Sequence, residues 1–588
     1  MHVRSRRGWL IALPGVIAFL VYLPVLGHGL VWDDIPFLRD HPLYRVPELW
    51  RQAVRQHLGF SSNYFRPLAV LTLIGEMRLG GDTSPTIFHL TNVILHVANT
   101  VLVTLLARHL ALSDAGRGKT GKPSRGVFPA PVVAGLFYGL HPALVEGVSF
   151  VSCRFDLLLT TFLLLALLAD AKLPRRGLVR PLAVGLAFLL AALSKEMAVA
   201  MVFVLPFWHL ALARRQRGVL GKASDNLASY AALLVAGVVY LVVRRAALGY
   251  LLLPQAGIAT GNALQHVLLV ARSLIEYLII IVWPFTTLTP LHVTTLPIPL
   301  HDAFAWASLA AVVGLIAGLV KLTLGAPRSG ALLAAVFLSL LPVANLLPLD
   351  LGGSAFVAER FLVFPLALVA LGTVPLLLRA ALPRPRLWWA FAGLWLFAAA
   401  VTIERTLPHW RNDLTLWTWG GQRARRSATP PANLARYYAH ERDHERCLAA
   451  ARRAIELDPR AHAAWNLAGH ALMALERYAE AQTDFEQAVR LVPKSGLYWN
   501  NLAGAIMEQK KYETAERLLL EEALPRDPME PATRLNLGIV YLLTERPALA
   551  VPHFREALRL VTPAERAETQ ALLDHAISGR GAGGAQSP

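Results

Sequence analysis

Long apolar runs dominate the first 405 residues of the chain and predict a membrane-embedded helical domain. A helix needs about 20 mostly apolar residues to cross the hydrocarbon core of a bilayer. Such runs occur at 9–27, 86–107, 130–150, 153–171, 227–247, 302–320, 330–348, 357–379 and 387–403. The longer run 181–213 is broken by Ser194-Lys195-Glu196, so we interpret it as two short spans that turn at this tripeptide. The pattern predicts 11 spans in residues 1–405.

Basic residues predict the orientation of these spans, because Lys and Arg collect in cytoplasmic loops. Six basic groups all fall on one side of an 11-span arrangement: Arg4, Arg6 and Arg7; Arg117, Lys119, Lys122 and Arg125; Lys172, Arg175, Arg176 and Arg180; Arg214, Arg215, Arg217 and Lys222; Lys321 and Arg328; Arg379, Arg384 and Arg386. The N-terminus is then cytoplasmic, while the first loop (about 28–85) and the region after about 404 are outside. The apolar segment 262–283 would reverse this order if it crossed, so we interpret it as a membrane-embedded or re-entrant helix.

The region after Arg405 has a soluble, helical composition and repeats with a period near 34 residues. The first helix of each copy carries Asn433-Leu434-Ala435, Asn466-Leu467-Ala468, Asn501-Leu502-Ala503 or Asn536-Leu537-Gly538, and the second carries Cys447, Ala451, Ala454, Pro459; Ala481, Phe485, Ala488, Pro493; Ala515, Leu519, Ala523, Pro528; or Ala550, Phe554, Ala557, Pro563. This pattern resembles the tetratricopeptide repeat. It predicts a linker at 406–426, about four repeats at 427–575 and a disordered tail at 576–588.

The four recurring asparagines allow two interpretations. Asn433, Asn466, Asn501 and Asn536 either satisfy local polar contacts or form a ladder that holds the backbone of an extended peptide on the concave face of the repeats. Both interpretations fit a repeat domain that recruits a protein or glycan acceptor.

Composition narrows the class of protein. The chain is 55% hydrophobic and 16% charged, with a mean hydropathy of +0.45, which excludes a soluble globular enzyme and a disordered chain. The net charge of +18 follows the predicted topology, so nucleic acid is not an expected partner. The two cysteines, Cys153 and Cys447, lie too far apart in sequence for a CxxC metal site or a disulfide framework.

Charged side chains gather at the predicted outer ends of the spans, where they are costly and usually functional. They include Asp33, Asp34, Arg66, His141, Glu146, Arg154, Asp156, Lys195, Glu196, Arg244, Glu359 and Arg360. Carboxylates and cations together at one membrane edge suggest a general base and a phosphate clamp. In a simpler interpretation, Glu196 only neutralises Lys195 and Glu359 only neutralises Arg360.

Several of these residues belong to motifs of a known family. The motifs are Trp32-Asp33-Asp34, Tyr64-Phe65-Arg66-Pro67-Leu68 preceded by Asn63, Phe88-His89-Leu90-Thr91-Asn92-Val93-Ile94-Leu95-His96, His141-Pro142 with Glu146, Arg154-Phe155-Asp156, Ser194-Lys195-Glu196 and Ala358-Glu359-Arg360-Phe361-Leu362. With the repeats that follow, they resemble the transmembrane and tetratricopeptide-repeat-containing (TMTC) protein O-mannosyltransferases and their bacterial relatives. The Arg-rich composition and four repeats suggest a bacterial member.

The resemblance implies an all-α fold: a polytopic GT-C-like membrane bundle followed by a repeat solenoid. It also implies inverting transfer of a sugar, mannose in the family, from a polyprenyl phosphate to a hydroxyl of an extracytoplasmic acceptor, with the catalytic acid in the first outer loop. Asp33 or Asp34 would be the base. Arg66, Arg154, Lys195, Arg244 and Arg360 are candidates to stabilise the departing phosphate, while Glu146, Asp156 and Glu196 orient sugar hydroxyls or these cations.

Three points stay open at this stage. No cofactor is required, although a divalent metal could bridge Asp33 or Asp34 to the phosphate. The acceptor could be a Ser or Thr of a protein, a glycolipid or a polysaccharide. A non-catalytic membrane scaffold that carries repeats is the competing class, but an anchor has no need of 11 spans or of charges aligned on one face. The expected location is the plasma (inner) membrane.

Overall fold

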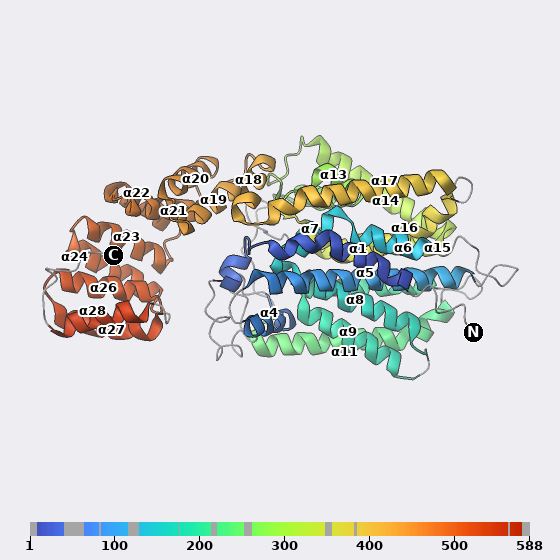
Figure 1. The fold of residues 1–588 in the computed structure, drawn as a ribbon, viewed down its shortest axis with the longest axis horizontal. Coiled ribbons are helices and arrows are strands. Elements are labelled where there is room, and N and C mark those ends of the chain that lie inside the picture. Colours follow the sequence, from blue (N-terminus) through green and yellow to red (C-terminus); the bar gives the residue numbers. More distant parts are fainter. Residues whose placement is uncertain are drawn as a thin grey trace. The chain divides into compact units, whose positions relative to one another are not determined.

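The structure is a computed structural model that describes residues 9–39, 64–80, 84–115, 129–175, 177–212, 220–251, 261–346, 355–381, 385–561 and 565–578. It divides into two compact units, Met1–Arg423 and Ala424–Pro588 (Figure 1). The basic groups at 4–7 and 117–125, together with Asn63, Arg176, Arg384, Pro563 and most of the tail, lie outside the described residues, as do the side chains at 214–222 and Arg379.

The first unit is a helical bundle. Its main helices are α1 (Trp9–Tyr22), α4 (Pro67–Gly80), α5 (Pro85–Ala115), α6 (Pro129–Gly139), α7 (Val145–Ser149), α8 (Arg154–Lys172), α9 (Val179–Ser194), α10 (Ala200–Leu212), α11 (Leu220–Leu248), α12 (Ala263–Val282), α14 (Ala303–Gly325), α15 (Pro327–Leu340), α16 (Val363–Ala381), α17 (Pro385–Thr406) and α18 (Asp413–Arg423). α5 packs against α1, α6 and α8, and α9 packs against α8 and α11 (Figure 1).

Seven helices of the described residues are long and apolar enough to cross a bilayer. The pair α6 and α7, bent by 49° at His141-Pro142, adds an eighth span if it is counted as one. Three further apolar helices are shorter: Val179–Ser194, Glu196–Leu212 and Pro327–Val343. The all-α fold is confirmed. Two of these short helices, Val179–Ser194 and Glu196–Leu212, are the two short spans expected at 181–213, and the third falls at the run expected at 330–348. None of the three reaches the length of about 20 residues that a straight crossing of about 30 Å needs at 1.5 Å per residue.

The two ends of the bundle differ in chemistry. At one end, Arg328 donates to the carbonyls of Leu110 and Ala211, which close α5 and α10. The motif residues lie at the other ends of α5 and α10. We call this end of the bundle the site end. The break at Lys195 lies there, since its extended backbone (φ −161°, ψ 136°) separates α9 from the 3-10 turn Glu196–Val199. The predicted turn at the tripeptide is confirmed.

Helix α12 corresponds to the predicted 262–283 segment. Its polar contacts with the rest of the bundle, from its first turn to its last, are made at the site end. His266 near its start contacts the Leu346 carbonyl, which follows α15, and the Ile281 carbonyl at its other end contacts His141. Between them, Arg272 pairs with Asp302, which caps α14. Both ends of α12 therefore contact the same end of the bundle, although its length would suffice to cross.

Residues 406–426 are not the linker that we expected. α17 continues to Thr406, a 3-10 turn covers Leu407–Trp410, and α18 follows within the first unit. Trp410 and Trp417 are fully buried there. The segment is polar and lies between two domains in the sequence, which is why it was predicted to be a linker. The burial of these two indole rings packs it against the bundle instead.

The second unit contains four pairs of antiparallel helices and a final helix. They are α19 (Thr429–His440) with α20 (His444–Leu457), α21 (His462–Ala474) with α22 (Tyr478–Leu491), α23 (Gly496–Glu508) with α24 (Tyr512–Leu518) and its continuation to Arg526, α26 (Pro531–Leu543) with α27 (Pro547–Leu560), and α28 (Arg566–Ser578). The four asparagine motifs lie on the first helices, as predicted.

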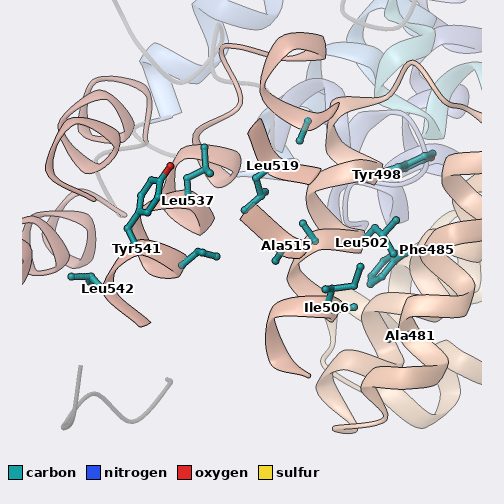
Figure 2. Close-up of a cluster of buried hydrophobic side chains, with 14 of the residues drawn as sticks. Ala481, Phe485, Tyr498, Leu502, Ile506, Ala515, Leu519, Leu537, Tyr541 and Leu542 are labelled. Atoms are coloured by element: carbon teal, nitrogen blue, oxygen red, sulfur yellow. The ribbon is translucent and has the colours of Figure 1, made fainter. Parts of the chain in front are cut away.

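The predicted small and aromatic positions form the core of this unit. Ala481 and Phe485 of α22 and Ala515 and Leu519 of the next repeat are fully buried in one continuous cluster (Figure 2). A residue with positive φ recurs in the turn of every pair, at Arg442, Glu476, Lys510 and Glu545. The turns and the core contacts of the second unit thus recur with the same spacing as the sequence repeat.

Two equivalent glycines test this packing. A Cβ on Gly469 would lie 2.6 Å from the Phe485 ring, whereas a Cβ on Gly504, one repeat later, meets nothing within 4 Å. We expect Gly469→Ala to destabilise the repeats by about 1–2 kcal/mol through overpacking. Gly504→Ala should stabilise them by about 0.4–1 kcal/mol, because it restricts the unfolded chain. Hydrogen exchange of the α21 to α23 amides measures both, and equal protection in the two variants would contradict the packing argument.

Candidate active site

The site is built around a turn that follows α1. The turn Trp32–Asp34 has Trp32 in the left-handed region (φ 54°), which is uncommon for a residue with a large side chain. The Trp32 ring stacks on Phe150 at 5.6 Å, with 6° between the planes. This geometry directs Asp34 into the protein and leaves Asp33 exposed.

Asp34 is fully buried, and both of its carboxylate oxygens accept hydrogen bonds. Oδ2 accepts from the Val151 N–H at 3.1 Å, while Oδ1 accepts from the Ser152 N–H at 2.7 Å and from the Ser152 hydroxyl at 2.6 Å. Burial raises the pKa of Asp34 to about 7, against the opposing effect of these three donors. The carboxylate therefore ties the first outer loop to the segment before α8.

This tie predicts a pH dependence. The three donors suit an ionised carboxylate, so protonation of Asp34 as the pH falls through about 7 should displace at least one of these hydrogen bonds, shift the turn and lower activity. Because burial raises the pKa of Asp34, this protonation costs the fold no stability, and the effect is expected in the rate alone. Ser152→Ala removes one donor that favours ionisation, so it raises the pKa of Asp34 and should shift the acidic limb of the pH–rate profile upward by about 0.5–1 pH unit.

Ser149→Ala is the matched control for that experiment. Its buried hydroxyl, three residues before Ser152, has no hydrogen-bond partner within the described part of the chain. It should leave the profile unchanged. If the pH–rate profile is also unchanged in Ser152→Ala, the acidic limb does not arise from the titration of Asp34.

Three ion pairs join the other motif residues across elements. Arg66 binds Glu196 through Nε at 3.0 Å and Nη2 at 2.6 Å, and Lys195 binds Asp156 at 2.6 Å. Arg360 binds Glu146 through its backbone N–H at 2.9 Å and through Nη1 at 2.5 Å. The simpler interpretation, in which Glu196 only neutralises Lys195 and Glu359 only neutralises Arg360, is wrong, because each of these four side chains binds a partner from another part of the chain.

The pairs lie close to one another. Charge interactions connect Arg66 with Asp156, and Arg360 with both Asp156 and Lys195. Arg66, Lys195 and Arg360 each use only part of their donor set within the described residues. The guanidinium of Arg360 also lies 5.6 Å from the centre of the Trp32 ring, so this cation is next to the acidic turn.

Arg154 has a different environment from these three cations. It is fully buried and donates to the Asn92 side chain at 3.0 Å, to Glu76 at 2.5 Å and to the Phe88 carbonyl at 2.7 Å. Asn92 in turn donates to the carbonyls of Phe150 and Val151. With its donors directed at protein groups, Arg154 holds α4, α5 and the Val151 segment together.

The remaining predicted residues lie at the margin of the ion pairs. His141 uses both ring nitrogens, since Nε2 faces the Ile281 carbonyl at 3.0 Å and Nδ1 accepts from the Ala143 N–H at 3.3 Å. Buried Glu359 accepts from the Thr289 N–H at 2.8 Å and lies 3.3 Å from His292. Arg244 donates to the Leu251 carbonyl at 2.8 Å.

An apolar groove of about 880 Å³ runs along α17 and ends beside this site. Phe137, Trp283 and Trp395 line it, with Arg405 at the site end of α17. His141 lies behind this lining, with its ring 5.2 Å from that of Phe137. The turn after His141 packs against the turn that carries Arg360. None of the residues that line the groove belongs to the three ion pairs, so His141 and its turn lie between the groove and the pairs.

Sequence reasoning missed Glu76, Ser152 and Asp413, each of which contacts a motif residue from a distant part of the chain. Glu76 is the one acid of the largely apolar helix α4, whose other charged residue is Arg78, and this was a usable signal. The sequence around Ser152 and Asp413 gave none. Among the described residues, no group of three or more His, Cys, Asp or Glu side chains is arranged to hold a metal ion.

Two of the recurring asparagines pair with an asparagine of the preceding repeat. Asn501 donates to Asn466 at 2.8 Å, and Asn536 donates to Asn500, the residue before Asn501, at 2.9 Å. Asn433 donates to the Thr429 carbonyl of its own helix. These bonds are the local polar contacts of the first interpretation, while the peptide ladder stays a prediction.

Known proteins with similar sequences are protein O-mannosyltransferases. Tmtc2 of Drosophila melanogaster is 29% identical over 228 residues, covering 36% of this chain and 22% of that protein. Tmtc3 of the same organism is 31% identical over 159 residues (24% and 17%), and human TMTC4 is 27% identical over 175 residues (28% and 23%). Over 24% to 36% of its length, the chain is similar to these TMTC proteins. It spans about a fifth of the length of these relatives.

The tetratricopeptide repeat family matches this chain at residues 466–531 and 511–565. Among solved structures, YrrB, a tetratricopeptide-repeat protein, is 22% identical and covers 28% of this chain and 82% of its own, with a TM-score of 0.24. PilF of Pseudomonas aeruginosa is 25% identical and covers 27% and 78%, with a TM-score of 0.23. The repeats expected from the sequence are confirmed by the family match.

Proposed function

We propose that the chain is an integral-membrane glycosyltransferase that moves a sugar from a polyprenyl-phosphate carrier to an acceptor hydroxyl. The observation that carries this proposal is the meeting of the acidic turn Trp32–Asp34 with the Arg360–Glu146 pair on the Trp32 ring. The carboxylates of this turn and the Arg360 guanidinium thus lie on adjacent segments at one end of an apolar bundle, which supports their assignment as base and phosphate-binding cation. The similarity to protein O-mannosyltransferases supports the same reaction class.

Asp33 is the better candidate for the general base. It is exposed on the turn, whereas both oxygens of Asp34 accept hydrogen bonds from Val151 and Ser152. Asp33 takes the proton of the acceptor hydroxyl while the hydroxyl oxygen attacks the anomeric carbon from the face opposite the phosphate. The configuration at that carbon is then inverted. Asp34 fixes the turn that presents Asp33.

The departing lipid phosphate carries negative charge that the site must stabilise. Arg360 and Arg66 fit this role because both are partly accessible and keep guanidinium N–H donors beyond those that their carboxylates occupy. The side chain of Lys195 keeps two of its three donors beyond Asp156. The paired acids hold these cations in place, so little reorganisation is needed when the phosphate leaves.

The apolar groove suits the isoprenoid chain of such a donor. Its aromatic lining along α17 can hold a branched hydrocarbon, and the turn after His141 lies between this lining and the turn that carries Arg360. Mannose is the first sugar to test, and Ser or Thr of an extracytoplasmic protein the first acceptor. The repeat unit would bind that acceptor outside the plasma membrane, with the N-terminus in the cytoplasm. No cofactor or metal ion takes part in this proposal.

Reconstitution of the full chain in lipid nanodiscs tests this function. Radiolabelled mannosyl phosphoryl polyprenol and a Ser/Thr-rich peptide are supplied, with guanosine diphosphate mannose as the alternative donor and EDTA in a parallel reaction. We expect label on the peptide only with the lipid-linked donor, and no loss with EDTA. Glucosyl phosphoryl polyprenol tests the sugar.

Label that appears in lipid or polysaccharide, and not in peptide, would change the acceptor class to glycolipid or glycan. Activity lost with EDTA and restored by Mg²⁺ or Mn²⁺ would add a metal ion to the mechanism. Failure of every lipid-linked donor, in a preparation that is folded by size-exclusion chromatography, would refute the proposed reaction and favour the scaffold.

A further inference from the structure

Helix α18 contributes a buried acid to the turn that carries the proposed base. Oδ1 of Asp413, the first residue of α18, accepts a hydrogen bond from the Trp32 N–H at 2.7 Å. Trp32 is 8% exposed and Asp413 3% exposed, so water does not replace this contact readily. The donor belongs to the one residue of the turn that has positive φ.

Two further contacts join the same segments. The Gly29 N–H donates to the Arg411 carbonyl at 2.9 Å, and the edge of the Trp417 ring meets the Trp32 ring at 5.0 Å. The Trp32 ring therefore stacks on Phe150 and makes an edge-to-face contact with Trp417. Residues 411–417 therefore bind residues 29–32 in two ways. They accept hydrogen bonds from the Gly29 and Trp32 amides, and they pack against the Trp32 ring.

We propose that Asp413 is a positioning residue for sugar transfer. It anchors the Trp32 end of the turn, while Ser152 anchors the Asp34 end through the buried carboxylate. Asp33 lies between the two anchors. A displacement of about 1 Å in a catalytic group can cost about 10²-fold in rate, so an acid that touches no substrate can control the reaction in this way.

This inference rests on the proposed function and extends it to the segment before the repeats. α18 ends at Arg423, and the second unit begins at Ala424. The helix that completes the transfer site is thus the one that leads into the repeats. Its role is to hold the base in position, in addition to connecting two units.

Asp413→Ala and Asp413→Asn, made in the full chain, test the role of Asp413. The alanine variant should lower kcat by about 10- to 100-fold, with the KM for mannosyl phosphoryl polyprenol within about twofold. The asparagine variant should stay within about fivefold of wild type, because its amide oxygen can accept the same N–H. Asp302→Ala is the control, since Asp302 also accepts two backbone N–H groups at the site end but does not contact the turn.

The measurements are kcat, KM and the melting temperature of each variant in the same nanodisc preparation. Wild-type kcat in Asp413→Ala would overturn the proposal. So would equal losses of kcat in the alanine, asparagine and Asp302→Ala variants that follow their melting temperatures, because that result indicates stability alone. If Asp413→Ala does not accumulate, Asp413→Ser replaces it.

Hydrogen exchange separates this proposal from the proposed reaction. The Trp32 amide should be protected in wild type and in Asp413→Asn, and exchange at least tenfold faster in Asp413→Ala. If no lipid-linked donor is used but this pattern holds, the reaction assignment fails while the anchoring of the turn stands. If the Trp32 amide exchanges at one rate in all variants, the anchoring fails whatever the activity.

Discussion

Asp33→Asn is expected to lower sugar transfer by at least about 10²-fold while donor binding is retained. A general base contributes about 10²–10⁴-fold, and the amide of Asn cannot take the proton of the acceptor hydroxyl. The fold should not change, because Asp33 is exposed and the buried anchor of the turn is Asp34. Initial rates with mannosyl phosphoryl polyprenol, together with donor binding by equilibrium filtration, measure both.

Asp34→Asn is the companion variant for this experiment. Its amide nitrogen would face a backbone N–H in place of an oxygen acceptor, so the turn should loosen and the melting temperature should fall. Asp33→Asn should lower the rate without that loss of stability. A normal rate in Asp33→Asn combined with an inactive, stable Asp34→Asn would transfer the role of base to Asp34. Normal rates in both would remove the acidic turn from the mechanism.

The second large effect is expected at the Arg360–Glu146 pair. Arg360→Gln leaves the buried Glu146 carboxylate without its guanidinium partner, and breaking a buried pair costs about 3–5 kcal/mol. The double variant Arg360→Gln with Glu146→Gln removes both charges and should recover most of that stability. Transfer should stay low in both, by about 10²- to 10³-fold, since a positioned donor to the departing phosphate is lost.

Thermal unfolding and transfer rates in one nanodisc preparation distinguish the two roles of Arg360. Arg272→Gln is the matched control, because Arg272 also pairs with acids at the site end, Glu276 and Asp302, but lies in α12 away from the turn. It should keep the wild-type rate. Full recovery of transfer in the double variant would show that Arg360 acts only on stability and does not stabilise the phosphate.

The sequence predicted the elements of this fold well wherever the signal was local. The apolar runs became helices whose ends lie up to eight residues from the expected bounds, and the small and aromatic positions of the repeats became a buried core. The interpretation of 406–426 as a linker was wrong, because the burial of Trp410 and Trp417 depends on partners far away in the chain. The polar break at Lys195 was predicted correctly, since it divides the run 181–213 into two short helices.

By itself, the sequence determined that the protein is an all-α membrane bundle with tetratricopeptide repeats, and it brought out the charged motifs. The spacing of apolar residues and the length of each apolar run decide these features, and both can be read from neighbouring residues. Only the tertiary structure decided which charges meet: Asp34 with Ser152 across 118 positions, Arg360 with Glu146 across 214, and the Trp32 amide with Asp413 across 381. Such pairs form because a buried charge or N–H must find a partner in three dimensions, and residue order does not specify which helices become neighbours.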